Sequence, residues 1–170
     1  MKANFKEQII ELLDQHRIMT IATNRPDGWP QATVVGYTND ALVLYSFIAR
    51  GGQKYANIQH DPRVSIAIAN DYKQPLAIKG LSLAGRALVV DDIGEMEHAG
   101  DLLRRRYPEY RIMPPPNPAE VALIRVTPEL VSILDYSKGF GHTDLVRVTE
   151  QDLEDFVESH RHHWAMHPVD

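Results

Sequence analysis

A short segment near the middle of the chain combines the chemical groups that hold a phosphate. Tyr45 and Ser46 carry hydroxyls at the end of a β-rich run, and Arg50 precedes two glycines. Gln53 and Lys54 then open a helical pattern. Glycines let backbone amides approach an anion, and a helix start adds free N–H groups and the positive end of the helix dipole. The segment therefore indicates an anion site, although a solvent-exposed glycine loop before a helix has the same pattern.

The elements around this segment are mostly β-strands. Strands are expected at residues 18–23 and 31–37, joined by a turn at 24–30, and a third at 41–48 after a linker at 38–40. A short helix at 53–59 and a strand at 64–69 follow the glycines. Most linkers between strands are too short for helical crossovers, so the sheet should be mainly antiparallel.

The second half of the chain continues the β pattern and adds helices at its edges. A long strand is expected at 76–90, bent at Gly80 or Gly85, and a helix at 91–107 with Asp92 near its start. The remaining expected elements are a helix at 4–16 capped by Asn4, a proline-rich loop at 108–118, strands at 121–126, 130–134 and 145–148, and a helix at 150–164. Six or seven strands of this kind favour a small closed or split barrel, because closure removes sheet edges.

Composition narrows the classes of function. The chain of 170 residues fits one domain, residues 1–170, with 150–170 as a C-terminal helix and tail. A net charge of -5 argues against nucleic-acid binding, and without cysteine there is no thiolate site or disulfide. No apolar signal segment or membrane span is visible, so a cytoplasmic protein is expected. Redox chemistry would require a bound cofactor.

The glycine segment and the strand after it carry a family resemblance. Tyr45-Ser46, Lys54, Asn57-Ile58 and the run from Asp61 to Ser65, which reads DPRVS, resemble the pyridoxamine 5′-phosphate oxidase-like family of FMN-binding split barrels. The opening hairpin at 19–36 and the Gly85-Arg86-Ala87 triplet resemble other parts of that family. The segments at 126–129, 134–135 and 139–142 resemble its general-stress-protein-like branch. The resemblance covers about residues 5 to 145 and is sharpest from Lys54 to Ser65.

The resemblance implies a fold, a cofactor and an assembly. The fold is mainly β with peripheral helices, an antiparallel Greek-key-like split barrel, and the assembly is a homodimer with FMN at the subunit interface. Thr33, Val34 and Val35 would line the isoalloxazine. Gln31 stands where the pyridoxamine oxidases carry an arginine. The residues that would approach the ribityl phosphate are Tyr45, Ser46, Arg50, Gln53 and Lys54.

The function implied is that of an FMN-dependent oxidoreductase acting on an unidentified small molecule. FMN itself would carry hydride or electrons, so no protein acid or base need stand out, and none does. The tryptophan and arginine constellation that holds pyridoxal phosphate in the true oxidases is not recognisable in residues 160–170, which argues against vitamin B6 oxidation. Three alternatives stay open: a flavin-binding or sensing module without turnover, a haem-binding protein, and an enzyme using deazaflavin F420.

Histidines form a second candidate site near the end of the chain. His160, His163 and His167 would share one face of a continuing helix, which could hold a metal or a haem. Pro168 and the chain end favour solvated side chains instead, so no metal site is expected. His142, in a glycine-rich loop, is expected to cap or pack.

Overall fold

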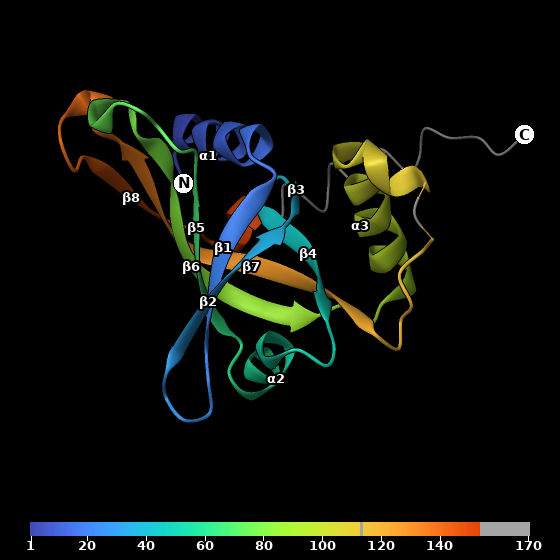
Figure 1. Ribbon diagram of the computed structural model, residues 1–170. Coiled ribbons are helices and arrows are strands. Elements are labelled where there is room, and N and C mark those ends of the chain that lie inside the picture. Colours follow the sequence, from blue (N-terminus) through green and yellow to red (C-terminus); the bar gives the residue numbers. More distant parts are fainter. Residues whose placement is uncertain (113, 154–170) are drawn as a thin grey trace, which may run out of the picture.

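The computed structural model describes residues 1–112 and 114–153, and its centre is one curled antiparallel sheet (Figure 1). Within these residues, eight strands follow the order β2-β1-β5-β6-β7-β4-β3, and β8 pairs with β7. The strands are β1 (Ile18–Asn24), β2 (Pro30–Gly36), β3 (Thr38–Asp40), β4 (Val43–Ala49), β5 (Arg63–Ala69), β6 (Lys79–Val89), β7 (Val121–Asp135) and β8 (Thr143–Arg147). The α-helices are α1 (Ala3–Gln15), α2 (Gln53–His60) and α3 (Ile93–Arg106).

The long strand β7 organises the sheet. Its first half pairs with β4, its second half pairs with β8, and β6 runs beside it along nearly its whole length. The ladder between β6 and β7 shifts register between Ala84 and Gly85, as the expected bend at Gly85 requires. Near the two ends of the sheet, the Ser46 hydroxyl of β4 donates to the Gly36 carbonyl of β2 at 2.8 Å. The sheet therefore curls into a split barrel, which confirms the expected fold class.

Two hydrophobic clusters lie on the two faces of β4. Leu44 and Ile48 point into the barrel with Ile21, Ile66 and other aliphatic residues, and α1 packs on the same cluster. The alternating residues of β4 point outward and are covered by α3, which makes nearly every position of this strand buried. The members of this outer cluster are Val43, Tyr45, Val90, Ala99, Leu103, Tyr107 and Leu123. In Figure 1, α3 accordingly stands apart from α1 and α2.

Most expected elements are present, with small shifts in their bounds. The expected helices at 4–16, 53–59 and 91–107 are α1, α2 and α3, and Asp92 caps α3 by accepting from the Glu95 amide at 2.8 Å. The cap expected for the first helix was wrong, because Lys2 is the N-cap and Asn4 lies inside the helix. Most of the range expected as a helix at 150–164 lies outside the described residues. No described helix is long and apolar enough to cross a membrane.

Three strand and loop expectations were wrong in detail. The linker expected at 38–40 is strand β3, which forms a tight hairpin with β4 through Ala41 in a left-handed conformation. The two strands expected at 121–126 and 130–134 are one strand, because Pro128 sits opposite the register shift at Gly85 and breaks no continuous ladder. Part of the loop expected at 108–118 is a 3₁₀ helix, Pro108–Ile112.

The bend at Gly85 gives a test of this packing. A Cβ on Gly85 would lie 2.4 Å from the Thr127 carbonyl oxygen, which is backbone and cannot rotate away. We expect Gly85→Ala to lower the free energy of unfolding by about 1–3 kcal/mol, measured by urea denaturation. The control is Gly94→Ala, on the exposed start of α3, where the nearest atom is 3.4 Å away and the change should be neutral or stabilising. Equal effects of the two substitutions would contradict the close approach of β6 and β7.

Candidate functional site

The start of α2 presents unpaired backbone donors. Gly52 is the N-cap and has no side chain that could cap the helix. The first turn of the helix also contains no acidic residue. The amides of Gln53 and Lys54 have no acceptor among residues 1–112 and 114–153. Free N–H groups at a helix start favour a negative charge. The helix start thus has the free donors that an anion site requires, and the anion site itself stays a prediction.

Lys54 lies on the packed face of α2. It is three and four residues from Asn57 and Ile58, whose side chains are buried against the barrel, so the stem of Lys54 is directed to the same side. Burial lowers the pKa of the Lys54 ammonium below its ordinary value. No described carboxylate forms an ion pair with this ammonium, so no charge among the described residues offsets the desolvation.

Arg50 is a second cation without a carboxylate partner among the described residues. Its Nε donates to the Pro118 carbonyl at 2.7 Å and its Nη1 donates to the Tyr55 hydroxyl at 3.1 Å. The Arg50 amide also donates to the Glu120 carbonyl at 2.8 Å. These contacts fix the loop before α2 against the segment that leads into β7 and hold the guanidinium beside the first turn of the helix.

Strand β2 directs its side chains alternately toward the inside of the barrel and toward an open face. Gln31, Thr33 and Val35 share one face, because side chains alternate along a strand, and Val35 packs against the barrel core. The buried hydroxyl of Thr33 has no hydrogen-bond partner in the described structure. Val34 points the other way and is 65% exposed. The four residues therefore divide between the inside of the barrel and an open face.

Tyr45 and Ser46, the last two residues of the sequence-predicted site, use their hydroxyls in hydrogen bonds away from the helix start. The Tyr45 hydroxyl lies under α3 and donates to Glu95 Oε1 at 2.9 Å, and burial raises the pKa of this phenol. Ser46 is fully buried and its hydroxyl donates to Gly36. The structure thus brings Arg50, Gln53 and Lys54 together at the helix start, places Gln31 against Asn57 of the same helix, and directs the hydroxyl of Tyr45 to the opposite face of β4.

Sequence reasoning gave no site role to Asn57, which ties α2 to the barrel. Its side chain is fully buried and donates to the Thr23 hydroxyl at 2.9 Å and to Gln31 Oε1 at 3.1 Å. Gln53 Nε2 donates in turn to Asn57 Oδ1 at 2.8 Å. In the sequence, the signal for this role is that Asn57 is a polar residue next to Ile58 on the apolar face of a short helix.

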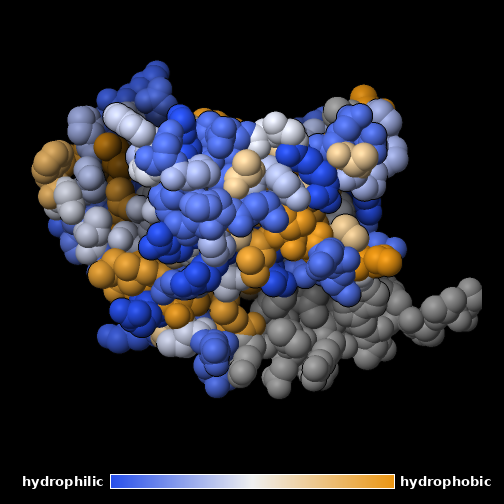
Figure 2. Space-filling view, turned by 90° about the horizontal axis from the view of Figure 1, so that it is seen from below, coloured by the Kyte–Doolittle hydropathy of each residue, from blue (hydrophilic) through white to orange (hydrophobic). Residues whose placement is uncertain are grey.

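The outer face of α2 is hydrophilic, and Figure 2 shows this side of the molecule as largely blue at its centre.

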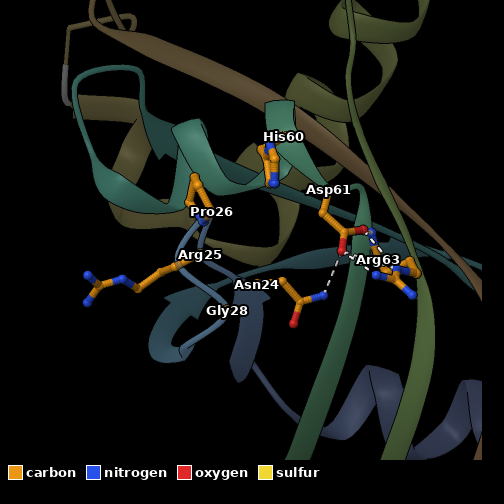
Figure 3. Close-up of a pocket in the computed structure, with 7 residues that line it drawn as sticks. All are labelled: Asn24, Arg25, Pro26, Gly28, His60, Asp61 and Arg63. Atoms are coloured by element: carbon orange, nitrogen blue, oxygen red, sulfur yellow. Dashed lines mark hydrogen bonds and ion pairs between the residues drawn. The ribbon is translucent and has the colours of Figure 1, made fainter.

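The family motif around Pro62 forms a rim at the far end of α2. Asp61 accepts three hydrogen bonds from the Arg63 guanidinium, one from the Arg63 backbone amide and one from Asn24 Nδ2 at 2.9 Å, and these bonds lower the pKa of the Asp61 carboxyl (Figure 3). An open hollow of about 570 Å³ lies beside it, lined by Asn24, Arg25, Pro26, Gly28, His60, Asp61 and Arg63. A second hollow, of about 470 Å³, lies between α3 and residues 114–116. Neither lining includes Lys54 or Thr33.

Comparison with protein families settles which family this chain belongs to. The family model described as pyridoxamine 5′-phosphate oxidase matches residues 5–135. The chain belongs to this family. The match runs from α1 to the end of β7, so it includes every strand of the sheet except β8, together with α2 and the Pro62 motif. The resemblance read from Lys54 to Ser65 is thereby confirmed. A search among curated proteins found no match.

Solved structures share the fold at low identity. A putative pyridoxamine 5′-phosphate oxidase from Listeria innocua is 21% identical, with a TM-score of 0.64 over 77% of this chain and 98% of that chain. General Stress Protein 26 from Bacillus anthracis str. Sterne is 20% identical, with a TM-score of 0.62 over 85% of this chain and 99% of that chain. A heme binding protein from Mycobacterium smegmatis is 21% identical, with a TM-score of 0.69 over 86% of this chain and 58% of that chain. The same fold therefore occurs in a putative oxidase, a general stress protein and a heme binding protein.

The histidines do not add a metal centre to this member of the pyridoxamine 5′-phosphate oxidase family within its described residues. No group of three or more His, Asp or Glu side chains in residues 1–112 and 114–153 could hold a metal ion. His142 Nε2 lies 3.3 Å from Asp144 Oδ2, next to Lys138, in the turn before β8. His160, His163 and His167 lie outside the described residues.

The burial of Lys54 predicts an effect on stability. Lys54→Met keeps the apolar stem and removes a partly desolvated charge, so the free energy of unfolding should rise, by up to about 1 kcal/mol. The measurement is urea denaturation without ligand. The control is Lys73→Met, at an exposed position, which should change stability by less than about 0.5 kcal/mol. A clear loss of stability in Lys54→Met alone would show that the ammonium already has a stabilising partner.

Proposed function

We propose that the protein binds FMN through its phosphate at the start of α2 and uses the flavin to transfer hydride or electrons to a small substrate. The observation that carries this proposal is the ammonium of Lys54, partly buried on the packed face of α2 with no described counter-ion. A phosphate placed there would offset the desolvation of Lys54 and accept from the free amides of Gln53 and Lys54. Membership of the pyridoxamine 5′-phosphate oxidase family supports the choice of a phosphorylated flavin.

The remaining residues fit a flavin extending along β2. Exposed Val34 offers an apolar contact to a ring, whereas the unpartnered Thr33 hydroxyl faces the inside of the barrel, on the other side of the strand. Arg50, fixed by Pro118 and Tyr55, adds positive charge at the helix start. When bound, FMN supplies the hydride or electron transfer, while these residues hold the phosphate, orient the ring and exclude water.

A homodimer is part of the same proposal. Ile18, Trp29 and Val34 are 60%, 71% and 65% exposed and belong to β1, β2 and the turn between them. Large apolar side chains gathered on one hairpin are typical of a surface that a partner covers. A second copy of the chain on this face would close the open side of the proposed flavin site, with the cofactor at the subunit interface.

Haem is the second candidate ligand, because one structure with the same fold is a heme binding protein. An absorption spectrum of the purified protein separates the two. The flavin proposal predicts an absorption band at about 450 nm and release of FMN when the protein is denatured. If the protein is purified colourless, the band should appear when FMN is added. A Soret band after loading with haemin, with no response to FMN, would support the haem candidate instead.

The phosphate contact predicts a specific loss of affinity. Lys54→Ala should weaken FMN binding about tenfold to a hundredfold, because a charge-assisted contact contributes about 1.5–3 kcal/mol. Riboflavin, which lacks the phosphate, should bind wild type and variant equally. The readout is quenching of flavin fluorescence, and Lys73→Ala is the matched control. Equal FMN affinity of Lys54→Ala and wild type would place the phosphate elsewhere.

A further inference from the structure

The amide of Asn57 is shared by three elements. Its Nδ2 donates to Thr23 of β1 and to Gln31 of β2, and its Oδ1 accepts from Gln53 at the first position of α2. Asn57 and Thr23 are 0% and 2% exposed, so water does not compete for these bonds. Every hydrogen-bonding atom of the Asn57 amide is therefore used, and each partner is placed by it.

This arrangement determines which end of Gln31 is available. Both N–H groups of Asn57 are donated, so Gln31 meets Asn57 with its carbonyl oxygen, at 3.1 Å. The other end of a planar side-chain amide is its NH₂ group. Gln31 Nε2 has no partner among residues 1–112 and 114–153. Gln31 therefore has its acceptor bound to Asn57 of α2, and its NH₂ group is left as a free donor.

The same amide fixes the rotation of α2. Asn57 lies one helical turn after Lys54 on the same face, so its bonds to two strands determine which side of the helix faces the barrel. The bond from Gln53 to Asn57 Oδ1 holds the first turn of the helix in place. A rotation of α2 that moved Lys54 toward solvent would break the bonds to Thr23 and Gln31 together.

We propose that Asn57 is a positioning residue of the anion site, which turns the Gln31 amide into a donor toward the ligand and holds Lys54 on the packed face of α2. This inference rests on the proposed function, in that the ligand is taken to be the phosphate of FMN. Asn57 itself does not touch that phosphate. Its effect passes through Gln31 and Lys54, so it should alter the recognition of the phosphate and not of the flavin ring.

The test compares FMN with riboflavin in Asn57→Ala. We expect the ratio of FMN affinity to riboflavin affinity to fall about tenfold, because both phosphate contacts lose their placement. Asn39→Ala is the matched control: Asn39 is also a buried asparagine with two hydrogen bonds, but it lies on β3. This control should keep the wild-type ratio even if it loses stability. An equal loss for both ligands in Asn57→Ala would mean a purely structural role and would overturn the proposal.

A second variant keeps the test decisive if Asn57→Ala does not fold. Gln31→Met keeps the size of the side chain but removes the free donor, and it should lower the affinity ratio about tenfold on its own. In the double variant with Asn57→Asp, which is nearly isosteric, the losses should be less than additive, because both act on the same contact. Fully additive losses, or no loss in Gln31→Met, would contradict the proposal. Failure of wild type to bind FMN would instead contradict the proposed function.

Discussion

The ammonium of Lys54 is held partly out of water on the packed face of α2, and no described carboxylate accompanies it. A partly desolvated charge destabilises a folded protein unless something pairs with it. Here the unpaired backbone amides of Gln53 and Lys54 add further positive potential at the same helix start. In the proposed function, a bound phosphate is the partner that satisfies all of these groups together.

The rest of the fold serves to keep this helix start in place. Strand β4 is buried on both faces, by the barrel core on one and by α3 on the other, so its end at Ala49 is a rigid point from which the loop to α2 begins. Arg50 then ties that loop to the segment before β7, and Asn57 ties α2 to β1 and β2. Because these anchors come from separate elements, the cations are positioned before any ligand arrives.

The sequence predicted the elements better than the contacts of their side chains. Alternating apolar residues and turn clusters located the strands, and Asp92 marked the start of α3, because these are local signals. The expectation of two strands around Pro128 was wrong, because a proline is tolerated inside a strand where it lies opposite a register shift. Tyr45 was placed at the phosphate by its position in the segment, yet its hydroxyl is directed to Glu95, fifty residues away, and only the tertiary structure reveals that partner. The role of Asn57 was equally invisible, because Thr23 and Gln31 come near it only when the barrel curls.

The most direct measurement is a crystal structure of the protein grown with FMN. We predict that a phosphate oxygen lies within about 3 Å of Lys54 Nζ and accepts from the amides at the start of α2, with the ring along β2. A phosphate bound instead between Arg25 and Arg63 in the hollow at the far end of α2, or a flavin that does not approach Lys54, would contradict this account.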